Sequence, residues 1–333
     1  MKEKLFGRYG KMQQEFWKDK RVFITGSAGF LGCWLSNNLA DAGAKITGLD
    51  IEIKQGSNFH NFDLKNKINQ LNVDITNYDL LTKTFKEHEP EIVFHLAAQP
   101  LVTEANKNPL PTFENNIRGT WNVLESARNS NINGIIVASS DKAYGIPEKL
   151  PYDENHKLHG VYPYDVSKSV KDLISQAYHK TFGLPVGITR CGNFFGGGDL
   201  YFDRIVPGTI KSFIFNESPI IRSDGKFIRD YIYIKDVVDA YTTLAENINK
   251  VKGHAFNFST EIPLDVLTIV NKIASLMNSN IQPTILNQVK AEIREQHLTS
   301  KKAREMLGWQ AKYDLDSALK ETIEWYKEHF NGK

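Results

Sequence analysis

Residues 21–32 read Arg-Val-Phe-Ile-Thr-Gly-Ser-Ala-Gly-Phe-Leu-Gly. The stretch begins with a continuous apolar run, which is typical of a parallel strand buried on both faces of a sheet. Three glycines, Gly26, Gly29 and Gly32, then lead into a helix. The first permits a tight turn, the second lets the backbone approach a pyrophosphate, and the third lets helix and strand pack closely. The stretch therefore predicts a strand–turn–helix unit whose free N–H groups face phosphates.

Strands and helices alternate beyond this unit. We expect further strands at 45–50, in a short segment closed by 74–75, and at 92–97, 134–139 and 184–190, with helices at 77–87, 110–129 and 165–182. This rhythm predicts an α/β fold with a Rossmann-type doubly wound parallel sheet. The pattern changes after about residue 191, although 230–244 reads as a strand and helix that could rejoin the sheet. We therefore expect a smaller, discontinuous C-terminal α/β substrate domain.

Composition excludes several classes of protein. The chain has 333 residues and a net charge of +2, so a basic face for nucleic acid is not expected. Cys33 and Cys191 both lie in apolar surroundings and are expected to be core thiols, not a disulfide or a metal site. The first twenty residues lack the apolar core of a signal peptide, and no apolar run approaches the ~20 residues of a membrane span. We expect a cytoplasmic protein without a membrane partner.

Acidic residues at the ends of the predicted strands indicate which dinucleotide cofactor binds. Asp50 ends the second strand, where a carboxylate accepts hydrogen bonds from both adenosine ribose hydroxyls and repels a 2′-phosphate. NAD is therefore favoured over NADP, with a capping role for Asp50 as the alternative. Asp74 and Ile75 should lie beside the adenine, unless Asp74 caps a helix. The remaining residues expected to contact the cofactor come from the glycine turn and the fourth strand, namely Ala28, Phe30, Leu31, Leu96, Ala97, Ala98 and Gln99.

Tyr164 and Lys168 are predicted to carry the chemistry. Four residues apart, they lie one helical turn apart on the same face. A nearby ammonium favours the phenolate and lowers the tyrosine pKa, so that Tyr164 could remove a hydroxyl proton while hydride leaves for the nicotinamide. Lys168 could also hold the nicotinamide ribose, and Ser140 should reach the same substrate hydroxyl.

Asp141 and Lys142 directly follow Ser140 and are surplus to a plain dehydrogenase or epimerase. A neighbouring acid and base are what the elimination of water next to a ketone requires. One group takes the proton alpha to the carbonyl, and the other protonates the departing hydroxyl. The alternative is a turn with solvated charges.

These residues resemble the extended short-chain dehydrogenase/reductase family over 18–326. The resemblance rests on Thr25-Gly26-x-x-Gly29-Phe30-x-Gly32, His95-Leu96-Ala97-Ala98, Asn116-Ile117-x-Gly119-Thr120, Tyr164-x-x-x-Lys168 and Leu307-Gly308-Trp309. Within the family the chain is most similar to the nucleotide-sugar 4,6-dehydratases, and among those to the CDP-glucose branch. The matching pieces are Ala98-Gln99-Pro100-Leu101-Val102, Ser140-Asp141-Lys142, Gly192-Asn193-x-x-Gly196-Gly197-Gly198-Asp199 and Asp203-Arg204-Ile205-Val206-Pro207.

The resemblance implies a lyase that keeps NAD bound through its cycle. Tyr164 would deprotonate the sugar 4-hydroxyl while the C4 hydride passes to NAD, and Asp141 would protonate the leaving 6-hydroxyl. Lys142 stands where a glutamate base follows the aspartate in the dTDP-glucose branch, and it would have to be partly neutral, which burial near Lys168 could achieve. The hydride returns to C6 and gives a 4-keto-6-deoxy sugar.

The resemblance also implies how the substrate is held. Asn193 should touch the substrate phosphates or sugar, and Arg204 and Arg229 could bind the pyrophosphate bidentately, unless either forms a surface ion pair. Asn116 should order the active-site backbone. Residues 227–233 read like the wider family, and 292–298 lack a clean match, so a UDP-N-acetylhexosamine or GDP-sugar remains open beside CDP-glucose.

The same resemblance implies which parts of the chain bind NAD and which bind the nucleotide sugar. Residues 1–190, with about 230–258, should bind NAD, and 191–229 and 259–333 should bind the nucleotide sugar. A homodimer is expected through the helices at 110–129 and 165–182. Two alternatives to the dehydratase stay open, a 4-epimerase on the same scaffold and a non-catalytic NAD-binding regulator. The surplus pair Asp141 and Lys142 counts against the first, and the intact Ser140, Tyr164 and Lys168 count against the second.

Overall fold

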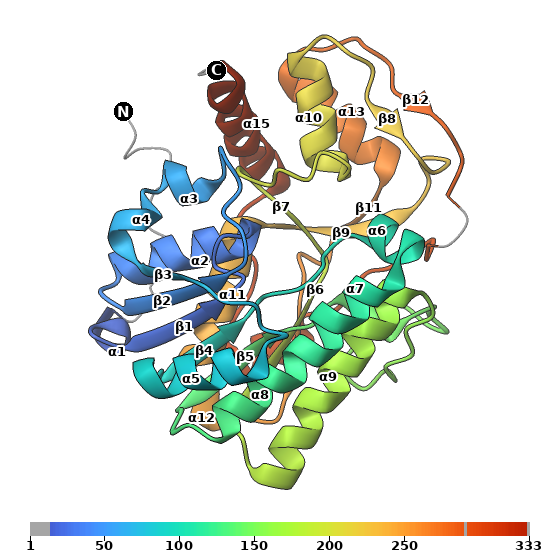
Figure 1. Ribbon diagram of the computed structural model, residues 1–333. Helices are drawn as coiled ribbons and strands as arrows, with labels where there is room; N and C mark the ends of the chain where they lie inside the picture. The colour runs from blue at the N-terminus through green and yellow to red at the C-terminus, as the bar shows by residue number, and fades with distance from the viewer. Residues whose placement is uncertain (1–13, 290–291, 332–333) are drawn as a thin grey trace.

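A seven-stranded parallel sheet forms the centre of the molecule in the computed structural model, which describes residues 14–289 and 292–331 (Figure 1). Its strand order is β10-β6-β5-β4-β1-β2-β3, the doubly wound order of a Rossmann-type sheet with one strand added. The predicted fold class is therefore confirmed. The strands are β1 (Arg21–Thr25), β2 (Lys45–Asp50), β3 (Asn69–Asn72), β4 (Ile92–His95), β5 (Gly134–Ala138), β6 (Val186–Cys191) and β10 (Ala255–Phe258).

Helices cover both faces of this sheet because alternate strand residues point to opposite sides. Val22 and Ile24 of β1 belong to the core that contains α2 and α11, whereas Phe23 belongs to the core that contains α5 and α8. Both layers are therefore apolar, as a parallel sheet requires. The covering helices are α2 (Phe30–Asp41) and α11 (Ile234–Glu246) on one face, and α5 (Tyr78–His88), α8 (Gly119–Arg128) and α9 (Pro163–Phe182) on the other.

Two predicted elements differ in detail from the structure. The helix predicted at 110–129 is a continuous run of α7 (Pro109–Phe113), a π-helical turn η2 (Glu114–Arg118) and α8. Single π turns of this kind are frequent at functional sites. The third strand ends at Asn72 instead of Ile75, because the Asp74 side chain turns back and accepts hydrogen bonds from the N–H and hydroxyl of Thr76.

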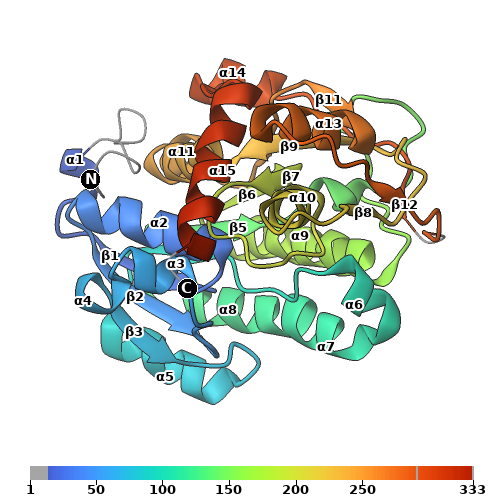
Figure 2. The same cartoon turned by 90° about the horizontal axis from the view of Figure 1, so that it is seen from above.

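Two smaller sheets stand beside the carboxyl ends of the large one, and Figure 2 shows α10 and α13 over them. Their strands are β7 (Asn193–Phe195), β9 (Ile228–Tyr233) and β11 (Pro263–Asp265) in one sheet, and β8 (Ile220–Ile221) and β12 (Thr284–Ile285) in the other. The remaining helices are α1 (Gln14–Trp17), α3 (Asn58–Asn61), α4 (Leu64–Lys67), α6 (Val102–Lys107), η3 (Asp141–Tyr144), α10 (Ile205–Ile214), α12 (Ile248–Val251), α13 (Val266–Met277), α14 (Lys301–Leu307) and α15 (Leu315–Asn331).

The strand predicted near Asp230 does not rejoin the large sheet. It is β9, which pairs with β7 and β11, and the helix after it, α11, is the part that packs on the large sheet. The prediction was wrong for the strand. Arg229 and Asp230 are buried and need polar partners, and the segment 292–298 and Ser259 provide them beside the small sheet. The seventh strand of the large sheet is β10 instead.

No helix among residues 14–289 and 292–331 has the length and apolar character needed to cross a membrane.

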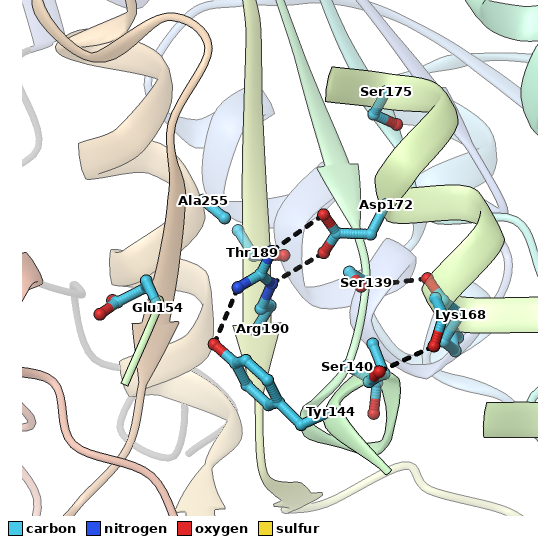
Figure 3. Close-up of polar contacts among 12 residues, drawn as sticks. Ser139, Ser140, Tyr144, Glu154, Lys168, Asp172, Ser175, Thr189, Arg190 and Ala255 are labelled. Carbon is cyan, nitrogen blue, oxygen red and sulfur yellow. Dashed lines mark hydrogen bonds and ion pairs between the residues drawn. The ribbon is translucent and has the colours of Figure 1, made fainter. Parts of the chain in front are cut away.

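A buried ion pair joins β6 to α9 behind the carboxyl ends of the strands (Figure 3). Arg190 donates two parallel hydrogen bonds to Asp172, with Nε–Oδ2 at 2.8 Å and Nη2–Oδ1 at 3.0 Å. A third donor, Nη1, reaches the Tyr144 hydroxyl at 2.9 Å, and that hydroxyl donates to Asn257 at 2.7 Å. The network ties η3 and β10 to the helix that carries Tyr164.

We predict that Asp172→Ala lowers the free energy of unfolding by about 3–5 kcal/mol, because it leaves the Arg190 guanidinium charged and unpaired in the interior. Glu114→Ala is the matched control, since Glu114 pairs with Arg118 while both side chains are more than half exposed. An exposed helical pair is worth about 0.3–0.5 kcal/mol. Urea unfolding of the two variants measures the difference, and equal losses would contradict the assigned role of the buried pair.

Candidate active site

A cavity of about 970 Å³ opens at the carboxyl ends of the parallel strands, where the connections that follow the neighbouring strands β1 and β4 run to opposite faces of the sheet. This point of a doubly wound sheet is where ligands bind. The cavity extends from the glycine turn to the strands β7 and β8. Among the described residues, its walls contain every predicted site residue apart from Asp141, namely Gly26, Ala28, Gly29, Phe30, Leu31, Gly32, Asp50, Asp74, Ile75, Leu96, Ala97, Ala98, Gln99, Ser140, Lys142, Tyr164, Lys168, Asn193, Arg204 and Arg229.

The glycine turn has the geometry of a phosphate cradle. Gly26 has a φ of +74°, and a Cβ placed there would lie 2.8 Å from the backbone nitrogen of Ala97. At Gly32 a Cβ would come within 2.0 Å of the Gly26 carbonyl oxygen. Gly29 is the N-cap of α2 and has no side chain to occupy the first-turn N–H groups. Those groups and the positive helix end are therefore available to a pyrophosphate, which fits a dinucleotide cofactor.

Asp50 and Asp74 lie along the same wall. The Asp50 carboxylate accepts hydrogen bonds from the N–H groups of Ala28 and Ile51, both at 2.9 Å, and burial raises its pKa. It therefore holds the glycine turn against β2 while lining the cavity. Asp74 lines the cavity as well but does not cap the following helix, because Asn77 is the N-cap of α5.

A chain of hydrogen bonds behind the cavity wall was missed by the sequence analysis. Ala97 N–H donates to the Thr25 hydroxyl at 3.2 Å, and that hydroxyl lies 2.8 Å from His95 Nδ1. His95 Nε2 lies 2.9 Å from the Thr120 hydroxyl, which donates to the Asn116 carbonyl at 2.6 Å. Burial, with Lys171 and Lys168 nearby, keeps the pKa of His95 well below its usual value. A neutral His95 can thus connect β1, β4 and η2.

Asn116 extends this chain to the helix of Tyr164. Its side chain accepts from Gln99 N–H at 2.7 Å and donates to Ser167 Oγ at 2.9 Å, and Ser167 donates to the Tyr164 carbonyl at 2.7 Å. The predicted role of Asn116 in ordering the active-site backbone agrees with these contacts. Another residue that the sequence did not single out is Lys171, a buried amine whose Nζ donates to the Ala97 carbonyl at 3.3 Å.

Tyr164 and Lys168 lie on one face of α9, as predicted, but their electrostatics differ from the prediction. Burial raises the pKa of Tyr164, and the opposing charge comes from Arg204. Lys168 Nζ lies 5.6 Å from the centre of the Tyr164 ring and donates to the Ala138 carbonyl at 3.2 Å. Burial lowers the pKa of Lys168 to about 8. The predicted lowering of the Tyr164 pKa by Lys168 is therefore wrong for the protein alone, because the loss of solvation outweighs the charges around the phenol.

Ser140, Asp141 and Lys142 form the start of η3 at the end of β5. The Ser140 hydroxyl accepts from Lys142 N–H at 3.2 Å and donates to Asp141 Oδ1 at 2.9 Å. Asp141 is 2% exposed, and its Oδ2 has no hydrogen-bond partner among the described residues. Asp141 therefore lies behind the cavity wall, and its neighbour Ser140 is the residue that lines the cavity.

Lys142 is half-buried and lines the cavity, but its neighbours are acidic. Its Nζ donates to Gln296 Oε1 at 2.8 Å. Burial raises the pKa of Asp165 to about 6 against the opposing charge of Lys142. Burial would also raise the pKa of Glu292, yet Lys142 and Arg229 lower it overall. The burial beside Lys168 that was expected to neutralise Lys142 is not what the structure shows.

The two predicted arginines differ. Arg229 donates to Glu292 Oε1 at 2.7 Å and to the carbonyls of Ile293 and Arg294 at 2.6 and 3.1 Å, so its donors are held within the protein. It fixes the segment that carries Gln296, and the prediction that it binds pyrophosphate is not supported by these contacts. Arg204 pairs with Asp199 at 2.9 Å and keeps a third of its side chain exposed, and it lines the cavity with Asn193.

Asp165 gives a testable pH dependence. Its pKa is raised from 3.8 to about 6 on folding, so its stabilising contribution is complete below about pH 4 and is lost as the pH rises through 6. We predict that Asp165→Asn, which cannot ionise, raises the free energy of unfolding by up to about 3 kcal/mol at pH 8. The gain should shrink at pH 5. Urea unfolding at both pH values measures it, and a gain independent of pH would refute the assignment.

Among the described residues, no group of three or more His, Cys, Asp or Glu side chains is placed to hold a metal ion.

Comparison with known proteins identifies related chains. The model of a family described as "NAD dependent epimerase/dehydratase family" matches residues 22–259. A CDP-glucose 4,6-dehydratase from Salmonella typhimurium is 30% identical over 97% of this chain and 94% of its own length. A putative UDP-glucose 4-epimerase from Methanocaldococcus jannaschii is 32% identical over 92% of this chain and 99% of its own.

Solved structures of both an epimerase and a dehydratase also resemble this chain. The UDP-glucose 4-epimerase of Thermotoga maritima with UDP-glucose superposes with a TM-score of 0.86 at 26% identity, covering 93% of this chain and 99% of that one. A dTDP-glucose 4,6-dehydratase from Bacillus anthracis, in complex with NAD, has the same fold, with a TM-score of 0.83 at 23% identity over 93% of this chain and 97% of its own. Dehydratases and epimerases are thus similar to this chain to about the same degree.

Proposed function

This chain belongs to the NAD dependent epimerase/dehydratase family, with NAD as its cofactor, and we propose that it is a nucleotide-sugar 4,6-dehydratase. The reaction would convert an NDP-hexose of the CDP-glucose or UDP-sugar type into the NDP-4-keto-6-deoxyhexose. Three chemical events are needed, namely oxidation at C4, loss of water across C5 and C6, and return of hydride to C6. We place the protein in the cytoplasm.

Within the proposed reaction, four polar side chains in and behind the cavity wall each have one role. NAD, when bound, supplies the hydride acceptor and a positive charge in the groove. Tyr164 takes the proton of the sugar 4-hydroxyl, and the ammonium of Lys168 stabilises the phenolate that this requires. Asp141 gives a proton to the leaving 6-hydroxyl through Ser140. Lys142 is our candidate for the group that takes the C5 proton.

Asp165 lies beside Lys142 and has a pKa that burial raises to about 6. A lysine acts as a base only after it has shed a proton, and an ionised carboxylate beside it favours the ammonium instead. The assignment of Lys142 therefore rests on the family resemblance and on its place on the cavity wall. Asn193 and Arg204, which also line the cavity, are proposed to hold the sugar and its phosphates.

One observation carries the choice of a dehydratase over the other functions. The Asp141 carboxyl accepts a hydrogen bond from Ser140 at 2.9 Å, and Ser140 lines the cavity together with Tyr164. A buried acid connected in this way is required for elimination. It has no task in an enzyme that oxidises and reduces the same carbon, nor in a protein that only binds NAD.

A 4-epimerase is the second candidate. It is supported by the 32% identity to the putative epimerase over nearly its whole length. The depth of Asp141 behind Ser140 also fits an enzyme whose cavity wall presents only the groups for oxidation at C4.

A symmetric homodimer is part of the proposal. Trp121 on α8 and Leu173 on α9 are large apolar side chains that are 43% and 51% exposed, on the two helices that the family resemblance implicates in pairing. We also propose that residues 1–190, with 234–258, bind NAD, and that 191–233 and 259–333 bind the nucleotide sugar.

Incubation with separate nucleotide sugars, followed by mass analysis, tests the proposed function. The panel is CDP-glucose, UDP-glucose, UDP-N-acetylglucosamine, dTDP-glucose and GDP-mannose. Loss of one water from one substrate is the expected result and names the sugar. A change of sugar without a change of mass would establish the epimerase instead.

A further inference from the structure

This inference rests on the proposed function. In the proposed reaction, two side chains end the catalytic cycle in a different protonation state from the one in which they began it. Hydride leaves C4 and arrives at C6, and the C5 proton is removed and replaced at the same carbon. The proton of the 4-hydroxyl is left on Tyr164, whereas the proton in the departing water comes from Asp141. Tyr164 therefore ends each turnover with one proton too many and Asp141 with one too few. One proton must pass from Tyr164 to Asp141 before the next cycle.

Asp141 is poorly placed to recover that proton from solvent. It is 2% exposed, and it is not among the described residues that line the cavity. Asp165, Asp230 and the Tyr152 phenol lie near it, and burial raises the pKa of each of these groups, with a smaller contribution from the charge of Asp141.

The Ser140 hydroxyl is the connection between the two groups. A hydroxyl has one proton to donate and two lone pairs that accept. Here the proton goes to Asp141 Oδ1 at 2.9 Å, and one lone pair accepts Lys142 N–H at 3.2 Å. The other lone pair can accept from the Tyr164 phenol, which lines the same cavity and lies close enough for Ser140 to act on its pKa. The cap to Lys142 fixes the rotamer of Ser140.

We propose that the Ser140 hydroxyl carries one proton per turnover from Tyr164 to Asp141 and so resets the enzyme. In this step the Tyr164 O–H bond breaks as a new O–H forms on Ser140. The original Ser140 O–H breaks as an O–H forms on Asp141. Nothing is oxidised, and no water or other reactant enters. In the structure Ser140 donates to Asp141, which is the direction that the second half of this transfer requires.

An epimerase has no need of this transfer, because the proton that Tyr164 takes from the 4-hydroxyl returns to the same oxygen. The connection to Asp141 therefore belongs to the dehydratase reaction alone. It also explains why an acid that protonates a leaving group can lie behind the cavity wall instead of in it.

Ser140→Val and Ser140→Thr form a matched pair for testing the proposal, because the two new side chains have the same shape and only threonine keeps the hydroxyl. Both variants are first checked for bound NAD and for unfolding temperature. The rate is then measured with substrate deuterated at C4, and with increasing imidazole at constant pH and ionic strength. We expect Ser140→Val to turn over at least about tenfold more slowly than Ser140→Thr, a size typical of lost proton transfer.

The isotope effect distinguishes two roles of Ser140, namely proton transfer from Tyr164 to Asp141 after turnover and assistance to the oxidation at C4. If reset limits Ser140→Val, its kcat becomes insensitive to deuterium at C4 and rises with imidazole, which can carry protons in place of the hydroxyl. A deuterium effect on kcat as large as that of the wild type, or larger, would overturn the proposal. In that case water would still be lost by the wild type, so the dehydratase would stand. If the wild type loses no water from any substrate, the proposed function itself fails.

Discussion

Tyr164→Phe is expected to abolish turnover while leaving NAD bound. The phenol lines the cavity and is our proposed acceptor of the substrate proton, so its removal should delete a general base worth about 10²–10⁴-fold in rate. The side chain is only 9% exposed, so the phenylalanine ring fits the same space. NAD should remain because the glycine turn and Asp50, which we propose hold the dinucleotide, do not contact the phenol.

Tyr178→Phe is the control for this variant. Tyr178 lies on the same helix, but its hydroxyl donates to Glu125 at 3.0 Å and does not line the cavity among the described residues. Its loss should leave kcat within about twofold of the wild type. The test compares kcat and the NAD released on denaturation for the two variants. Normal turnover by Tyr164→Phe would contradict the assignment of Tyr164 as the general base.

Asp141→Asn is expected to slow elimination by about 10²-fold or more while slowing oxidation at C4 much less. An asparagine can still accept the hydrogen bond from Ser140, so the geometry of η3 is kept, but it has no proton to give to the leaving hydroxyl. Reduced cofactor should therefore build up during turnover. Stopped-flow absorbance of NADH, compared with the rate of water loss, measures the two steps separately.

The control for Asp141→Asn is Asp239→Asn, which removes a carboxylate that pairs with Lys312 on the surface of α11. It should leave both steps unchanged. Equal slowing of oxidation and elimination in Asp141→Asn would remove Asp141 from its assigned role as the acid.

The parts of the fold that were predicted correctly depend on local sequence. The apolar run of β1, the glycines after it and the spacing of Tyr164 and Lys168 each report their own backbone conformation. The order of strands along a parallel sheet then follows from their alternation with helices. This local information was sufficient to bring nearly all of the predicted residues to one cavity.

The errors came from contacts between distant segments. Asp141 lies behind Ser140, and Lys142 lies among carboxylates, because the segment 292–296 and the start of α9 close over η3. Arg229 is occupied by the same segment, which has no recognisable pattern of its own. Such long-range pairings set burial and charge, and neither can be read from residue spacing.

The chain through His95 shows a signal that could have been used. A histidine at the end of a buried strand, with threonines at the end of the neighbouring strand and in the following helix, can be satisfied only by those hydroxyls. In the sequence, His95 was recognised only as part of the motif His95-Leu96-Ala97-Ala98. Its hydrogen bonds to Thr25 and Thr120 make it part of the support of Asn116 and the cofactor groove.

The central claim is that hydride leaves C4 and returns to C6 of the same sugar. The direct measurement is the position of deuterium in the product formed from a nucleotide sugar labelled at C4. We predict a product that has lost one water and carries the deuterium on its C6 methyl group. A product of unchanged mass that keeps the deuterium at C4 would contradict the account and establish epimerisation.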